Sequence, residues 1–359
     1  MKFFFTSVFS LFSLFSISQV VFPFEDYNYY FKSFENENFR QLEFQRIKEY
    51  KYGDEFVAYI DTRGNLRVYD GKERQDISNL NVSYKISDHL MGYGFGPTLN
   101  MWEKGKLQTL TYFAQNYEVR DSLIVFEDTR FNTINVYWNN KIREVFRMTG
   151  DLEMPTVIGD NIFVYKDNGN NYKIYYQGAS TEIGVWNGTI DFQVGCDIIC
   201  FNDPTTRTFA AFDHGQLVDV ENFYMNKYRA GRGFIVYEDL NNNLILYKKG
   251  EKTNLSNFGA SQWEVKDDMI YWVENNLAYV YQNNEKILLA NYIPKDYQIK
   301  NNTIAFRNIM GGVSTLNDGK VVELTNQQTS VYEINGNSVL INLFNRSYLL
   351  YSKGNKYEF

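Results

Sequence analysis

The sequence has 359 residues and a net charge of −7 at pH 7, from 36 Lys and Arg against 43 Asp and Glu. Hydrophobic residues make up 44% and charged residues 22%, which is the composition of a globular rather than a disordered protein. The acidic balance argues against sequence-independent nucleic-acid binding, because neutralising phosphates needs an excess of Lys and Arg. Two His and two Cys leave little material for His-based catalysis or a zinc site, and no cofactor is expected.

The first 18 residues have the pattern of a secretory signal peptide. Lys2 precedes a short apolar run to about Ile17, and the small residues Ser16 and Ser18 predict cleavage between Ser18 and Gln19. An uncleaved membrane anchor is the alternative, although the run is short for a membrane span and contains five serines. No second hydrophobic span follows. We therefore expect an exported protein, secreted or periplasmic, with no membrane span after cleavage.

A repeat of about 35 residues organises the chain after residue 48. A short phrase that follows an aromatic-rich segment ends in Gly or Asn nine times, at intervals of 34 to 38 residues: Gly71, Gly105, Asn140, Gly178, Gly215, Gly250, Asn284, Gly319 and Gly354. Gly and Asn accept the positive φ angles that tight hairpins require. The spacing therefore predicts nine hairpins in register.

A second series of residues has the same period and divides each repeat into four strands. An aromatic recurs near the start of each unit, and Thr156 occupies the one slot without an aromatic: Tyr50, Tyr84, Tyr117, Phe192, Tyr228, Trp263, Tyr297 and Tyr332. This residue marks strand A. Strand B is a short apolar run such as 162–165, strand C is aromatic, as in 172–176, and strand D follows the Gly or Asn, as in 320–324.

Three connections in each unit are tight, whereas the connection from strand D to the next strand A takes six to nine residues. That asymmetry predicts an all-β protein, a β-propeller of four-stranded blades, in which the chain crosses from the outer strand of one blade to the inner strand of the next. Nine repeats indicate nine blades, with seven or eight as alternatives. The predicted organisation is a signal peptide at 1–18, an N-terminal segment at 19–47 with a closing strand at 39–44, and a propeller at 48–359.

The repeat resembles that of TolB-like and other WD40-like exported β-propeller proteins. In both, a short inner strand and a tight turn precede two aromatic or β-branched strands and a strand that ends near Leu-Thr, here Leu324-Thr325. The Ser-Pro-Asp-Gly that the family usually has at the A–B turn is replaced here by sequences such as Gly159-Asp160-Asn161. The resemblance therefore implies the architecture and no specific partner.

Acidic residues recur at the turn between strands B and C: Asp61, Asp128, Asp167 and Asp239. Clustered oxygen ligands could form calcium sites, and these four residues are the metal-binding alternative. Asp side chains also bond their own backbone and so form turns, and none of the four matches an EF-hand loop. We interpret them as turn formers and predict no metal site.

Aromatics also recur in the D–A loops, eight residues after the closing Gly or Asn: Phe113, Trp186, Phe223, Phe258 and Tyr292. They could hold a ligand, or they could pack between blades, as their constant offset favours. Positions where the repeat becomes irregular are the better functional candidates, because a loop that departs from the pattern is free to contact a ligand. The predicted ligand-binding residues are Thr156, Trp186, Asn187, Phe223, Tyr224 and Lys227.

The function that these patterns favour is a non-catalytic, monomeric binding scaffold for a protein or glycan partner. The alternative is a glycan-active hydrolase or lyase that uses paired carboxylates on the face where these loops emerge. The sequence singles out no catalytic pair, so it does not decide whether the protein is an enzyme.

Overall fold

The computed structural model describes residues 21–359 except 80, 150–152, 187, 329 and 345. The predicted signal peptide and its cleavage site lie outside the described residues. The described chain forms strands and turns, and none of it forms a helix long and apolar enough to cross a membrane.

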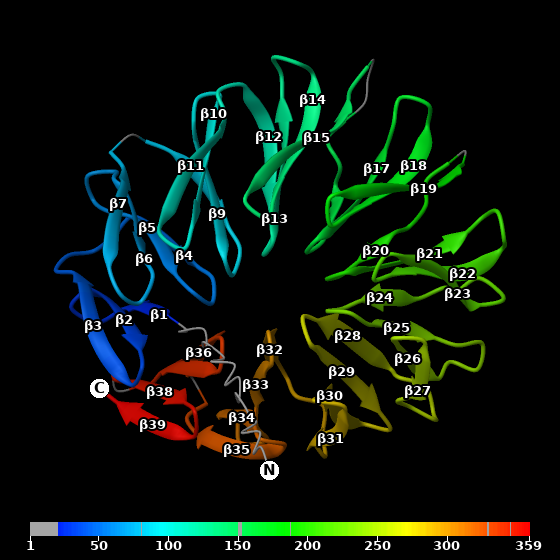
Figure 1. Ribbon diagram of the computed structural model, residues 1–359. Helices are drawn as coiled ribbons and strands as arrows, with labels where there is room; N and C mark the ends of the chain where they lie inside the picture. The colour runs from blue at the N-terminus through cyan, green and yellow to red at the C-terminus, as the bar shows by residue number, and fades with distance from the viewer. Residues whose placement is uncertain (1–20, 80, 150–152, 187, 329, 345) are drawn as a thin grey trace, which may run out of the picture.

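The strands form ten antiparallel sheets, which we call the N-terminal blade and blades 1 to 9 in chain order (Figure 1). The N-terminal blade has three strands, β1 (Phe22–Glu25), β2 (Phe31–Glu35) and β3 (Asn38–Glu43). Blades 1 to 3 are β4 (Glu49–Tyr52), β5 (Val57–Ile60), β6 (Leu66–Tyr69), β7 (Arg74–Ser78); β8 (Ser83–Ile86), β9 (Leu90–Phe95), β10 (Thr98–Glu103), β11 (Lys106–Thr111); and β12 (Ala114–Val119), β13 (Leu123–Asp128), β14 (Thr133–Trp138), β15 (Lys141–Arg147).

Blades 4 to 9 have the same four-stranded order. Blades 4 to 6 are β16 (Val157–Ile158), β17 (Ile162–Lys166), β18 (Asn171–Tyr176), β19 (Ala179–Val185); β20 (Gln193–Val194), β21 (Ile198–Asp203), β22 (Thr208–Asp213), β23 (Gln216–Glu221); and β24 (Tyr228–Ala230), β25 (Ile235–Glu238), β26 (Leu244–Lys248), β27 (Glu251–Asn254). Blades 7 to 9 are β28 (Gln262–Lys266), β29 (Met269–Glu274), β30 (Leu277–Gln282), β31 (Glu285–Ala290); β32 (Tyr297–Lys300), β33 (Thr303–Arg307), β34 (Val313–Asn317), β35 (Lys320–Thr325); and β36 (Val331–Asn335), β37 (Ser338–Asn342), β38 (Tyr348–Ser352), β39 (Asn355–Glu358).

The sheets stand around a central axis, with strands such as β20, β24 and β32 nearest the centre and β27, β35 and β39 at the periphery (Figure 1). Each four-stranded blade follows the predicted A–B–C–D order. The A–B and C–D turns therefore emerge on one face of the ring, which we call the turn face. The B–C turns and D–A loops emerge on the opposite face, which we call the loop face.

The predicted number of blades is wrong, because the ring has ten blades rather than nine, eight or seven. The missed blade is the N-terminal one. Its hairpin between β2 and β3 turns at Asn36 and Glu37, whose φ angles are 46° and 63°. Glu37 lies 34 residues before Gly71 and occupies the closing position of the repeat. A search for Gly or Asn at that position misses it, although the backbone conformation is the same left-handed one.

The turn between β1 and β2 carries a second mark of the repeat. The Asp26 carboxylate accepts hydrogen bonds from the backbone N–H groups of Asn28 and Tyr30, at 2.8 and 3.0 Å. Asp61 at the B–C turn of blade 1 accepts the same two bonds from residues two and four positions later. β1, β2 and β3 therefore correspond to strands B, C and D, and the segment predicted to be a closing strand is the outer strand β3, which pairs with β2.

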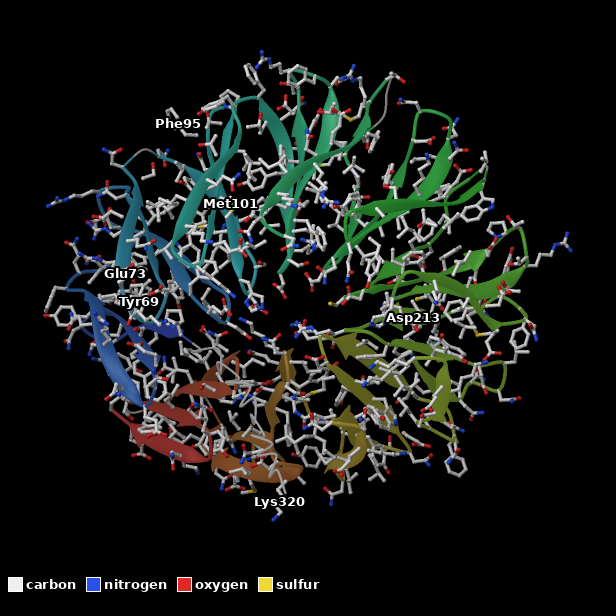
Figure 2. The ribbon with its side chains drawn as sticks, viewed as in Figure 1. Tyr69, Glu73, Phe95, Met101, Asp213 and Lys320 are labelled. Atoms are coloured by element: carbon white, nitrogen blue, oxygen red, sulfur yellow. The ribbon has the colours of Figure 1, made fainter. Side chains whose placement is uncertain are left out.

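The hydrophobic core is divided into ten clusters, and each cluster joins two neighbouring blades. Side chains fill the spaces between adjacent sheets, as Met101 does in Figure 2, whereas Phe95 lies at the outer margin of the ring. Large aromatic rings suit these spaces because adjacent twisted sheets diverge toward the periphery. The 18% aromatic content of the sequence therefore has a structural explanation.

The ring closes between the N-terminal blade and blade 9, and side chains form this contact. No strand of β1–β3 pairs with a strand of β36–β39 among the described residues. The ring of Phe24 contacts those of Tyr348 and Phe359, with centroids 5.9 and 5.3 Å apart, and Phe34 contacts Tyr357 at 5.2 Å. Polar contacts are few; the Asn335 amide, for example, donates to the Val21 carbonyl at 2.7 Å.

Glycines at the A–B turns allow the inner ends of neighbouring blades to touch. A Cβ atom on Gly195 would lie 1.9 Å from the carbonyl oxygen of Gly231, and one on Gly159 would lie 2.1 Å from that of Gly195. The backbone can approach this closely only where there is no side chain. The blades therefore converge on the central axis at the turn face.

Candidate binding surface

The loop face carries exposed apolar side chains that the turn face lacks. Every exposed large apolar side chain outside a strand, within the described part of the chain, lies on the loop face. They are Tyr27, Tyr29, Tyr30, Phe44, Tyr112, Phe113, Phe131, Phe223, Tyr224, Leu240, Phe258, Ile293, Ile309, Met310, Phe344 and the C-terminal Phe359. Because these side chains gather on one face, they are candidates for contact with other molecules.

The loop that presents Phe223 and Tyr224 is held in place from below. The side-chain amide of Asn202 donates to the Met225 carbonyl at 2.8 Å and accepts from the Met225 N–H at 2.9 Å. Met225 itself is buried, whereas the rings of Phe223 and Tyr224 are 39% and 45% exposed. The loop is therefore ordered with its two aromatic rings toward solvent, which lowers the entropy cost of binding a partner.

Phe258 is presented in the same way by the next D–A loop. One carboxylate oxygen of the buried Glu274 accepts the backbone N–H groups of Asn257 and Phe258, at 2.9 and 3.2 Å. The Phe258 ring is 77% exposed. A buried carboxylate stabilises a loop only when both of its oxygen atoms have partners. The second oxygen of Glu274 pairs with the Lys286 ammonium group at 3.3 Å.

The predicted ligand-binding residues divide between surface and core. Phe223, Tyr224, Lys227 and Thr156 are exposed on the loop face, with Lys227 paired to Glu238 at 3.1 Å. Asn187 lies outside the described residues.

Trp186 is only 8% exposed and packs among Tyr172, Phe192 and Phe201 in the cluster between blades 4 and 5. It has no exposed face for a ligand.

The D–A aromatics share one position in the repeat, but they differ in exposure. Trp186 is buried and Tyr292 is half-buried, whereas Phe113 and Phe258 are exposed. Sequence reasoning also missed exposed residues in B–C turns, such as Ile309, Met310 and Phe344. An apolar residue inside an otherwise polar turn is the signal that could have found them.

A polar cavity of about 830 Å³ lies on the loop face over blades 5 to 8. Among the predicted residues that the structure describes, only Lys227 lines the cavity, together with Arg229, Glu238, Trp263 and Glu264. Its two glutamates are already bonded: the Trp263 indole donates to Glu238 at 2.7 Å, and the Tyr297 hydroxyl donates to Glu264 at 2.8 Å. The cavity offers fixed charges and an indole to a partner beside the exposed rings of Phe223 and Tyr224.

The acidic residues of the B–C turns form their own turns. The Asp61 carboxylate accepts the N–H groups of Arg63 and Asn65 and the side-chain amide of Asn65, all at 2.9 Å. Asp167 and Asp239 make the equivalent three bonds, and Asp128 bonds the N–H of Arg130. Although burial acts to raise the pKa of Asp61, the hydrogen bonds from Asn65 and the charge of Arg67 lower it. These contacts support the turn-forming interpretation.

We expect a chelator to leave the melting temperature unchanged, because hydrogen-bond donors already occupy the oxygen atoms that calcium would need. The measurement is thermal unfolding in EDTA and in millimolar calcium. A calcium-dependent rise of more than a few degrees would show that the B–C turns bind the ion in the folded state.

At the turn face the A–B turns form a charged ring around the central axis. The Asp121 carboxylate accepts the N–H of Asp88 at 2.8 Å, and Asp160 accepts the N–H of Asp121 at 2.9 Å, so each carboxylate joins neighbouring blades. Lys300 of blade 8 reaches Asp54 of blade 1 and Asp88 of blade 2, at 3.7 and 3.8 Å. Charged side chains at this end of the ring therefore link blades that are not neighbours.

Two carboxyl groups in this ring have raised pKa values. Burial, together with Asp88, raises the pKa of Asp54 to about 6, and burial, together with Asp121, raises that of Asp160 to about 6. A carboxyl whose folded-state pKa is raised contributes stability below its unfolded pKa, and that contribution is lost as the pH rises toward the folded value. For Asp54 and Asp160 this contribution to stability is therefore lost between about pH 4 and pH 6.

We therefore expect the protein to melt at a higher temperature at pH 5 than at pH 7.5. The full shift of about two pKa units corresponds to at most about 3 kcal/mol for each group, and the part lost above pH 5 is about half of that. Asp160→Asn keeps an acceptor for the Asp121 N–H and should flatten the profile, whereas Asp318→Asn in an exposed turn should not. A melting temperature that climbs from pH 5 to pH 7.5 would contradict the assignment.

Ten blades around one axis, with distinct turn and loop faces, define the molecule as a β-propeller. The chain belongs to the family of 10-bladed β-propeller domains, whose match covers residues 15–357. No curated protein matches the sequence.

Several solved structures are similar to this chain at low values of identity and TM-score. Apo AztD from Citrobacter koseri is 11% identical, with 84% of this chain and 93% of that chain covered and a TM-score of 0.37. The computationally designed Ika8 protein is 14% identical, with 84% and 98% covered and a TM-score of 0.36. The CRINKLY WD40 ectodomain of the receptor kinase ACR4 from Arabidopsis thaliana is 7% identical, with 79% and 96% covered and a TM-score of 0.32. At such values these likenesses carry no argument about function.

Proposed function

We propose that this protein is an exported, non-catalytic scaffold that binds a protein partner through its loop face. The observation that carries the proposal is the confinement of exposed apolar loop residues to that face. A chain gains nothing in its own folding by holding such side chains in water, and the two D–A loops described above are fixed by the half-buried Asn202 and the buried Glu274. Ordered, exposed aromatic rings are the usual anchors of protein interfaces.

A protein partner is favoured over a glycan because of the aliphatic members of the set. Ile293, Ile309 and Met310 surround a depression of about 710 Å³ on blade 8, next to Lys295. Sugars are bound mainly by aromatic faces and polar groups, whereas exposed Ile and Met suit the apolar side chains of another protein. Export rests on the signal-like first 18 residues and on the resemblance of the repeat to TolB-like exported propellers.

The test is a pull-down from the extracytoplasmic fraction of the source organism with the purified protein as bait, followed by mass spectrometry. The double variant Tyr224→Ser, Phe258→Ser removes two exposed rings from neighbouring D–A loops. We expect it to lose the specific partner, with affinity at least 100-fold lower, because buried aromatic anchors typically contribute about 2 kcal/mol or more each.

The matched control is Leu217→Ser, Leu107→Ser on the outer strands β23 and β11, where the side chains are 47% and 53% exposed. It removes similar apolar area from the rim and should retain the partner. Equal loss of binding in both variants would contradict a loop-face site. Turnover of a polysaccharide by the wild-type protein would contradict the non-catalytic role.

A further inference from the structure

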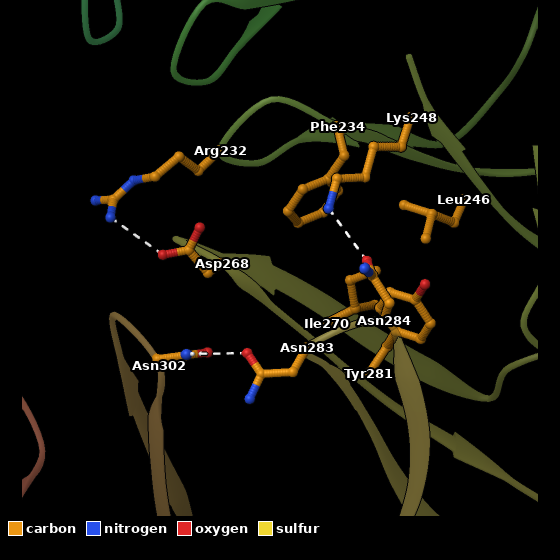
Figure 3. Close-up of a pocket in the computed structure, with 10 residues that line it drawn as sticks. All are labelled: Arg232, Phe234, Leu246, Lys248, Asp268, Ile270, Tyr281, Asn283, Asn284 and Asn302. Atoms are coloured by element: carbon orange, nitrogen blue, oxygen red, sulfur yellow. Dashed lines mark hydrogen bonds and ion pairs between the residues drawn. The ribbon is translucent and has the colours of Figure 1, made fainter. Parts of the chain in front are cut away.

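A cavity of about 400 Å³ opens between blades 6 and 7 (Figure 3). The A–B and C–D turns line it, so it lies on the turn face, opposite the loop-face surface. Lys248, at the end of β26, forms one wall. The C–D turn of blade 7 forms another through Asn283 and Asn284, both in the left-handed conformation with φ angles of 52° and 65°. Arg232 and Asp268 lie at a third side (Figure 3). The cavity is thus built by turns of the repeat rather than by an insertion.

Of the two basic side chains in the cavity, one has acidic partners and the other has none among the described residues. Arg232 is paired with Asp268 at 3.1 Å and with Asp121 at 3.6 Å. Lys248 instead donates to the neutral amide oxygen of Asn284 at 3.2 Å, and it makes no ion pair with any described residue. In a chain of net charge −7, this leaves a positive charge without a local counter-charge at the wall of a cavity.

Several polar groups in the cavity have unused hydrogen-bonding capacity. The oxygen of the Asn283 side chain accepts from Asn302 at 3.3 Å, and that of Asn284 accepts from Lys248, so the amide NH₂ groups of Asn283 and Asn284 have no partner within the described chain. The half-buried hydroxyl of Tyr281 likewise has none there. Asp268 engages one carboxylate oxygen with Arg232 and leaves the other available. The opening therefore presents free donors on Asn283 and Asn284 and a free acceptor on Asp268.

The floor of the cavity is apolar. Phe234, Leu246 and Ile270 line it, and each is at most 5% exposed. A ligand that fits must place one apolar face on this floor, direct hydroxyl groups to the amides and the free oxygen of Asp268, and bring a negative charge to Lys248.

We propose that this cavity binds a sugar that carries a carboxylate, such as a hexuronate unit of an acidic polysaccharide. The carboxylate pairs with Lys248, the ring hydroxyls bond to Asn283, Asn284 and Asp268, and the C–H face of the ring packs on Phe234 and Leu246. A neutral sugar leaves the Lys248 charge uncompensated. The volume holds one or two sugar units. The site goes beyond the proposed function and does not depend on it.

The test is titration calorimetry of the full-length protein with trigalacturonic acid, with maltotriose as the neutral probe. We expect millimolar or tighter binding of the acidic trisaccharide, at least 10-fold weaker binding of maltotriose, and weakening as salt is raised. Lys248→Met keeps the aliphatic stem and should lower the affinity at least 10-fold. Lys249→Met, which removes the same charge from the adjacent exposed residue, should change it less than twofold.

A second variant guards against an indirect effect of the first. Asn284→Gly removes the amide and keeps the positive φ angle, so it should also weaken binding at least fivefold with an unchanged melting temperature. The proposal is overturned if trigalacturonic acid does not bind at 10 mM, or if Lys249→Met weakens it as much as Lys248→Met. Acetate competing as well as the trisaccharide would reduce the site to a simple anion contact and would also overturn it.

Discussion

Phe24→Ala is expected to lower the free energy of unfolding by about 3–5 kcal/mol, the usual effect of truncating a buried Phe. Phe24 is 2% exposed and contacts Phe39, Tyr348 and Phe359, so it joins both sides of the closure. The N-terminal blade and blade 9 share no strand pairing among the described residues, so their side chains carry the closure. Chemical denaturation of the wild type and the variant measures the change.

The control for Phe24 is Phe44→Ala in the loop after β3. The Phe44 ring is 79% exposed, and its removal should change the free energy of unfolding by less than about 0.5 kcal/mol. Truncation after residue 319 removes the outer strand β35 of blade 8 and all of blade 9, and it should abolish cooperative unfolding because it leaves two blade surfaces uncovered. Wild-type stability of the Phe24 variant would mean that the ring does not depend on this aromatic closure.

Trp186→Ala is expected to destabilise the protein by about 3–5 kcal/mol without acting on partner binding directly. The ring packs between blades 4 and 5, and its indole N–H donates to the Thr205 hydroxyl at 2.8 Å. The substitution creates a cavity and removes the partner of Thr205. Thermal and chemical unfolding measure the loss, and Trp186→Phe should recover part of it because it keeps the apolar contacts.

Tyr224→Ala is the matched comparison for Trp186, because both lie in D–A loops of neighbouring blades. Its ring is 45% exposed, so stability should change by less than about 0.5 kcal/mol while binding of the pulled-down partner is lost. A small loss of stability at Trp186 would contradict its assignment to the core. A large loss of stability at Tyr224 would remove it from the candidate surface.

The four-stranded repeat was predictable because its signals are local. Tight hairpins such as Asp318-Gly319 require a left-handed backbone, and Gly and Asn adopt it most readily, so these residues mark the turns directly. The apolar B strands have the same basis, since a strand buried on both faces is a continuous apolar run. For the same reason the tenth blade escaped prediction: Glu37 adopts the left-handed conformation within its turn without being a residue type that signals it.

The binding surface and the closure depended on the tertiary structure. Trp186 and Phe258 occupy the same position in the repeat, yet Trp186 is 8% exposed and Phe258 is 77% exposed. Blades 4 and 5 cover the Trp186 ring, whereas the Glu274 carboxylate bonds the backbone of the Phe258 loop and holds that ring toward solvent. The cavity around Lys248 joins residues from β26, β29, β30, three A–B turns and a C–D turn, and no spacing in the sequence relates their side chains. The period of the sequence determines the strand order within each blade. The exposure of a side chain and its ion pairs depend on which blades lie next to each other, and the closed ring alone determines that.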